Sequence, residues 1–163
     1  AYSDIGRIHD EPDSPVPVQQ SQTLLSALPS DAIDALIKAA GPESGSPLLL
    51  VELRRLGGAL ARTPDHPSAF SHRHAPYALH TIGLAVPPDQ HIVAAAAQAA
   101  LASVEPWSTG AMFANFAPTS DPERIATAYD HHARERLLAL AGQYDPAGTL
   151  ATPGQLGAVR IAT

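Results

Sequence analysis

The spacing of apolar residues in this chain switches repeatedly between the 3.6-residue period of a helix and the two-residue alternation of a strand. Segments with the helical period are 30–40, 89–104 and 120–141. Segments predicted as strands are 48–56, 68–86 and the short aromatic-flanked 111–117. Long neighbouring strands joined by a short turn pair most readily in an antiparallel sheet. The sequence therefore predicts the α+β class, with an antiparallel β-sheet and helices packed on one face.

Residues at the ends of the predicted elements set their limits. Ser30 is a suitable cap for the first helix, which ends at Gly41. The predicted buried face of that helix carries Ile33, Leu36, Ile37 and Ala40. Pro76 cannot donate a ladder hydrogen bond, so segment 68–86 is either one strand with an irregularity there or two strands.

The last predicted helix begins with a capping-box pattern. Ser120 and Glu123 have the spacing in which a hydroxyl and a carboxylate satisfy the first free amides of a helix. One long helix is predicted from there to residue 141, and Gly142 is expected to end it.

Composition divides the chain into three parts. Residues 1–29 are rich in proline, serine and acidic side chains, which predicts an extended arm or linker. Residues 30–142 hold the predicted helices and strands of one α+β domain, and residues 143–163 form a C-terminal tail. At 163 residues the chain is large enough to bury a core.

Charge and residue usage narrow the function. A net charge of −6 with only ten Lys and Arg argues against a nucleic-acid surface. No run of apolar residues is long enough to cross a bilayer, so we expect no membrane partner. No signal peptide is visible, and a cytoplasmic location is expected. The absence of cysteine removes disulfides and thiolate chemistry.

Known catalytic motifs are missing. The eight histidines lack the spacing of a metal site, and although His72 and His74 would share a face of a strand, no carboxylate triad accompanies them. We therefore predict no metal and rank a metal-dependent enzyme built on these two residues last. There is no nucleophile elbow of a serine hydrolase and no glycine-rich phosphate-binding loop.

Two clusters combine polar and aromatic residues. Arg73, near Tyr77, either binds an anionic or carbonyl group or pairs with an acid such as Glu52. Asn115 lies between apolar neighbours in a predicted strand, where an unpaired amide is costly to bury. It is therefore expected to pair either with the backbone or with a ligand.

Four segments, in this order, resemble the C-terminal half of FAD-linked oxidases, in the berberine-bridge-enzyme-like branch of the vanillyl-alcohol-oxidase group. They are SPLLLVELRRLGGALAR, AFSHRHAPYAL, WSTGAMFANFAP and YDHHARERLLALAGQYDPAGTL. The resemblance covers about residues 30–156. It implies a substrate domain followed by a tail that returns to an FAD-binding domain, and that second domain has no counterpart in this sequence.

The resemblance assigns roles to individual residues. Arg73, expected on a sheet strand, matches a position that faces the substrate cavity, and Tyr77 lies nearby, where its hydroxyl would help to orient a substrate. Phe113, implied to bind the substrate, stands near the flavin ring where a tyrosine is usual. Asn115 matches an asparagine beside the flavin ring. In the tail, Asp145-Pro146 is kept, whereas the usual asparagines are replaced by Gly148, Pro153 and Gln155.

The function implied by the resemblance is that of the substrate-binding domain of an FAD-dependent oxidoreductase. Such an enzyme moves a hydride from its substrate to the flavin, which O2 reoxidises. The implied cofactor is FAD, and the implied partners are an FAD-binding domain or subunit and a small-molecule substrate. An exposed apolar face predicts that the chain also forms a homodimer. The alternative is a non-catalytic binding or interaction module derived from the same fold.

Overall fold

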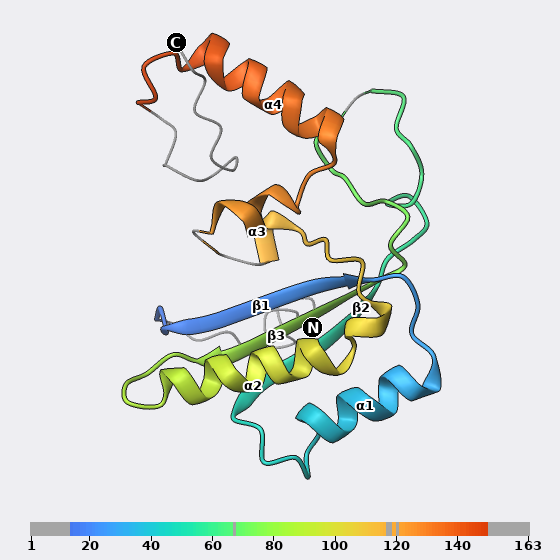
Figure 1. Cartoon of the computed structure of the whole chain (residues 1–163), viewed down its shortest axis with the longest axis vertical. Coiled ribbons are helices and arrows are strands. Elements are labelled where there is room, and N and C mark those ends of the chain that lie inside the picture. Colours follow the sequence, from blue (N-terminus) through green and yellow to red (C-terminus); the bar gives the residue numbers. More distant parts are fainter. Residues whose placement is uncertain (1–13, 67, 117–118, 120, 150–163) are drawn as a thin grey trace, which may run out of the picture.

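The computed structural model describes residues 14–66, 68–116, 119 and 121–149. Within them, three strands form one antiparallel sheet in the order β1-β3-β2 (Figure 1). The strands are β1 (Val18–Leu25), β2 (Leu48–Arg55) and β3 (Tyr77–Leu84). The helices are α1 (Ser30–Ala40), α2 (Gln90–Ser103), α3 (Pro122–Ala126) and α4 (His131–Tyr144), with 3-10 turns η2 (Glu105–Trp107) and η3 (Ala114–Phe116). The predicted α+β class is confirmed.

One face of the sheet carries the main core, beneath α2 and α1 (Figure 1). Strand alternation puts Leu25 and Leu79 on this face, where both are fully buried. The helix residues that complete this core cluster are Leu36, Ala100 and Val104. Gly83 lets α2 approach β3 closely, because a Cβ at this position would collide with Cγ1 of Val93.

The opposite face of the sheet is covered at one end by the chain that follows α2. Leu24 and Ala78 are buried there against Ala111 and Phe113. Backbone hydrogen bonds attach this cover to β1, from the Leu24 amide to the Ala111 carbonyl (3.0 Å) and from the Thr109 amide to the Leu24 carbonyl (2.8 Å). The helices α3 and α4 lie beyond this second face (Figure 1).

The strand β1 is the largest departure from the sequence prediction, which placed an arm or linker over residues 1–29. Residues 22–25 of this segment are among the most deeply buried in the protein. The sequence VQQSQTLL is mostly polar and gives no apolar alternation. Its strand conformation comes instead from pairing with β3 along its whole length. Residues 1–13 lie outside the described part of the chain.

Two further strand predictions are wrong. Segment 68–86 becomes a strand only after Pro76, and His72 adopts a left-handed conformation (φ 59°) that no extended strand contains. Arg73 therefore lies outside the sheet. In the segment 111–117, residues 114–116 form η3 in place of a strand. The Ala111 carbonyl still bonds β1, whereas the Phe113 amide donates to the side-chain Oε1 of Gln22 (2.6 Å).

The predicted long last helix is two helices. Asp130 interrupts it, because its side chain accepts a hydrogen bond from the Ala133 amide (2.8 Å) and caps a new helix, α4. Asp121 caps α3, and Ser120 lies outside the described residues. The helix α4 also runs through Gly142 to Tyr144.

Helix α1 has the predicted limits and ends at Gly41. Its cap and part of its buried face differ from the prediction. Pro29 occupies the N-cap position, and no side chain caps this end. Ala32 and Leu36 are buried, whereas Ile33 and Ile37 are 39% and 57% exposed. The reason is that α1 packs beside α2, which leaves one side of α1 facing solvent. Among the described residues, no helix is long and apolar enough to span a membrane.

Candidate functional site

A cavity of about 740 Å³ opens on the second face of the sheet. Its floor comes from all three strands, through Gln22 of β1, Glu52 of β2 and Ala78 of β3. Its walls come from connecting segments, and their aromatic members are Phe70, Phe113, Phe116 and Tyr129. Cavities of roughly 300–1,000 Å³ are typical of small-molecule sites.

A row of three polar side chains crosses the sheet at the cavity. Gln22 and Glu52 both lie opposite His80 in the strand register, so their side chains share one face. Gln22 is committed to the Phe113 amide, which fixes the position of η3 above the row. Phe116 packs edge-on against the His80 ring, with 5.7 Å between ring centroids. The row is thus partly covered from above by the aromatic wall.

His80 is a buried, neutral imidazole. Its Nε2 lies 3.1 Å from Oε1 of Gln20, so Nε2 carries the proton and Nδ1 is an acceptor. Nδ1 is buried without a hydrogen-bond partner among the described residues and lies 3.9 Å from Oε2 of Glu52. Burial lowers the pKa of His80 and outweighs the pull of the Glu52 carboxylate. The Glu52 contact is therefore not an ion pair at neutral pH.

Glu52 is the carboxylate of the cavity. Its Oε1 accepts a hydrogen bond of 2.6 Å from Nε of Arg54, and this bond lowers the pKa of Glu52. The side chain is 34% exposed, so a ligand can reach it. The Arg54 guanidinium also lies over Phe116, 4.5 Å from the ring centroid. This arrangement gives an ionised carboxylate beside a cation, at the floor of an aromatic-lined cavity.

The burial of His80 predicts a pH-dependent stability. In the unfolded chain its pKa returns to about 6.5, so the unfolded state binds the proton more readily. The free energy of unfolding is then highest above that pH and falls as the pH drops through the lower pKa of the folded state. We expect His80→Gln to flatten this fall between about pH 7 and 5, measured by urea unfolding.

The slope with pH, not the absolute stability, carries the His80 prediction. The matched control is His131→Gln, since the His131 side chain is 87% exposed. It should leave the slope unchanged. An unaltered slope in His80→Gln would show that other groups cause the acid loss.

The four residues that the sequence singled out lie in three different places. Phe113 and Asn115 line the cavity. Tyr77 lies opposite Leu25 and packs on the helix-covered face. Arg73 donates hydrogen bonds to the Leu60 carbonyl and the Ser68 hydroxyl, and it is not part of the cavity lining.

Two structural expectations about these residues are wrong. Arg73 does not pair with Glu52, whose partner is Arg54. Asn115 is exposed, so it does not carry the cost of burial that its apolar neighbours in the sequence suggested.

The rings of His72 and His74 lie edge-on, 6.3 Å between centroids, and Nε2 of His72 pairs with the Thr127 carbonyl (2.8 Å).

Sequence reasoning missed Glu52 and His80 as site residues. Both lie in the predicted strands, and the alternation of β2 correctly puts Glu52 and Arg54 on one face. What that alternation leaves open is which face the cavity occupies. The pairing register of β3 with both neighbours decides this, and a single sequence does not show it.

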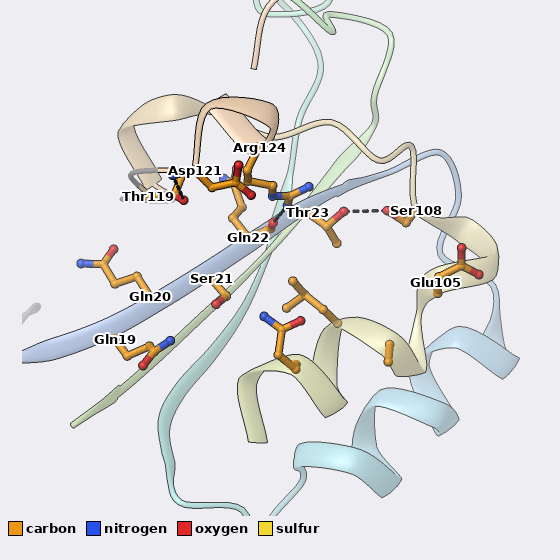
Figure 2. Close-up of a pocket in the computed structure, with 13 residues that line it drawn as sticks. Gln19, Gln20, Ser21, Gln22, Thr23, Glu105, Ser108, Thr119, Asp121 and Arg124 are labelled. Carbon is orange, nitrogen blue, oxygen red and sulfur yellow. Dashed lines mark hydrogen bonds between the residues drawn. The ribbon is translucent and has the colours of Figure 1, made fainter. Parts of the chain in front are cut away.

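A second cavity of about 630 Å³ runs along the outer edge of β1 (Figure 2). Arg124 of α3 reaches across it and donates to the carbonyls of Gln22 (2.6 Å) and Gly110 (3.2 Å). At the end of β1, the Thr23 and Ser108 hydroxyls share a hydrogen bond of 2.6 Å. These contacts attach α3 and the chain after α2 to the edge strand β1. The polar groups that make them therefore stabilise the walls of this cavity.

Solved structures share the fold of this chain. They include BBE-like 1 of Physcomitrella patens, as wild type and as a variant, each with a TM-score of 0.75 and 17% identity over 95% of this chain. Another is a xylooligosaccharide oxidase of Myceliophthora thermophila in complex with xylobiose, with a TM-score of 0.66 and 17% identity over 92% of this chain. These proteins are FAD-linked oxidases.

The likeness is one of fold and covers part of those enzymes. This chain spans about a third of their length, 33% and 34% respectively. No protein-family model matches the sequence, and neither does any curated protein. The predicted resemblance to FAD-linked oxidases is confirmed as a shared fold.

Proposed function

We propose that this chain is the substrate-binding domain of an FAD-dependent oxidoreductase, working with an FAD-binding domain or subunit. The observation that carries the proposal is the match of nearly the whole chain to one third of FAD-linked oxidases. The cavity on the second face of the sheet supplies a place for a small substrate beside an ionised carboxylate.

The described residues suit the ring end of a flavin and not its diphosphate. Diphosphates are held by free amides at helix N-termini. Here α2, α3 and α4 are each preceded by an aspartate, whose negative charge opposes a phosphate. The aromatic cavity, with Asn115 at its rim, has the flat apolar lining that a flavin ring needs. FAD would therefore be held mainly by the partner domain.

An apolar patch is available for that partner. Beyond the cover formed by η3, the second face of the sheet exposes Leu50 (40%) and Leu84 (40%), and Val86 (46%) follows β3. Exposed apolar side chains that lie together mark interaction surfaces. A second copy of the chain would compete for the same patch, and gel filtration distinguishes the homodimer from the monomer.

Residues of the chain have defined roles in this proposal. Bound FAD would supply the acceptor for a hydride from a substrate C–H bond, with O2 as the final acceptor of the two electrons. Glu52 would accept the proton that leaves the substrate O–H or N–H group, and its hydrogen bond with Arg54 favours the ionised form of this carboxylate. Phe113 and the other ring side chains exclude water and orient the substrate.

A non-catalytic binding module is the second candidate. The aspartates before α2, α3 and α4 favour it, because their negative charges oppose a phosphate at those three helix N-termini. Phe113, where the family usually has tyrosine, favours it too.

The visible absorption spectrum of the protein decides between the candidates. The protein would be purified from its own cells with its natural partners, then mixed with FAD and desalted. We expect flavin absorption bands that bleach when a substrate is added without oxygen. A protein that stays colourless both as purified and after mixing would favour the binding module.

A further inference from the structure

Aromatic side chains are concentrated in the cavity on the second face of the sheet. The chain has three phenylalanines, and all of them, Phe70, Phe113 and Phe116, line it together with Tyr129. Phe70 and Phe113 stack on each other with 4.8 Å between centroids. In a chain that is only 5% aromatic, this lining selects a flat apolar group over a flexible polar one.

A cation and a carboxylate lie together in the cavity lining. Arg54 and Glu52 meet there, whereas the guanidinium of Arg55 lies over Tyr77, 4.7 Å from the ring centroid, and Tyr77 packs on the helix-covered face. Glu52 occupies only Nε of Arg54. In the described part of the chain, the two terminal nitrogens of that guanidinium have no hydrogen-bond partner, so their donor pair is available to an anion.

Two other polar side chains of the cavity already have hydrogen-bond partners. Gln22 accepts from the Phe113 amide, and the Ser71 hydroxyl both donates to the Ala69 carbonyl and accepts from the Asp130 amide. A sugar presents many hydroxyl groups, each of which needs a partner when buried. The lining therefore suits a ligand with one charged group and an apolar ring.

We propose that the cavity binds an aromatic carboxylate, with the carboxylate on Arg54 and the ring among the phenylalanines. A guanidinium fork and a carboxylate match in planar geometry. Binding itself needs only residues of this chain. The further statement that this ligand is the substrate rests on the proposed oxidoreductase function.

The experiment is a calorimetric titration of the protein with benzoate, benzamide and xylobiose. We expect benzoate to bind, and benzamide, its neutral counterpart, to bind about tenfold more weakly or not at all. Arg54→Gln should weaken benzoate binding about tenfold or more, since it removes a charge-assisted hydrogen bond. Arg136→Gln, on the exposed surface of α4, should leave it unchanged.

A second variant tests the aromatic wall without changing charge. Phe113→Leu keeps an apolar side chain and should weaken benzoate binding roughly three- to tenfold. Circular dichroism spectra like that of the wild type would show that both variants fold. Tighter binding of xylobiose than of benzoate, or benzoate binding that Arg54→Gln leaves intact, would overturn the proposal.

This titration is independent of flavin. A protein that carries FAD but binds no aromatic carboxylate would support the proposed function and contradict this ligand class. A colourless protein that binds benzoate through Arg54 would support the ligand class and contradict the oxidase function.

Discussion

Glu52→Gln is expected to lower the turnover of the FAD-loaded oxidoreductase by about 10²–10⁴-fold. The amide has the shape of the carboxylate but cannot accept a proton. Since the carboxylate already pairs with Arg54, the substitution also removes a charge from the cavity floor. The measurement is stopped-flow reduction of the flavin by substrate without oxygen, which isolates the chemical step from reoxidation.

The matched control for Glu52→Gln is Glu43→Gln. Glu43 lies in the exposed turn between α1 and β2, outside the cavity lining. Its replacement should leave the rate of flavin reduction unchanged. A Glu52→Gln enzyme that reduces its flavin at the wild-type rate would mean that another group accepts the proton. The neutral His80, whose Nδ1 faces Glu52, would be the next residue to change.

Leu79→Ala is expected to lower the free energy of unfolding by about 2–5 kcal/mol. Leu79 lies on the central strand, is fully buried, and belongs to the cluster that joins β1 and β3 to α1 and α2. Its truncation removes apolar contacts and leaves a cavity that the paired strands cannot close. Because domains are stable by only about 5–15 kcal/mol, this one change removes a large share of the total.

Urea unfolding followed by circular dichroism measures the loss, with Leu49→Ala as the control. Leu49 lies on β2 at the irregularity in its pairing with β3 and is 63% exposed. We expect its truncation to change the stability by no more than about 0.5 kcal/mol. Equal losses in the two variants would contradict the assignment of the core to the helix-covered face.

The site was only partly predictable. Phe113 and Asn115 line the cavity, whereas Tyr77 lies on the opposite face of the sheet. A shift of one position along a strand reverses the face of every side chain, so a resemblance in sequence does not fix where Tyr77 lies. Glu52 and His80 meet because β2 and β3 pair in one register, and neither residue has a distinctive sequence context.

The sequence by itself determined the class of the fold and the limits of its locally specified elements. Helix 30–40 was predicted residue for residue, since a glycine-proline pair marks its end and a clear period marks its length. Strand β2 follows from its alternation, and Pro76 marks the residue before β3 begins. These features depend on the backbone preferences of a few neighbouring residues, and the local sequence determines those preferences.

The tertiary structure alone decided what depends on distant partners. The polar β1 becomes a buried strand because β3 supplies its hydrogen bonds and the chain after α2 covers it. The predicted long last helix divides at Asp130. The Asp130 side chain caps α4, and the Asp130 amide donates a hydrogen bond to the Ser71 hydroxyl. The cavity exists because three strands and three connecting segments meet around it. Contacts across many residues of sequence set each of these features, so no local period could reveal them.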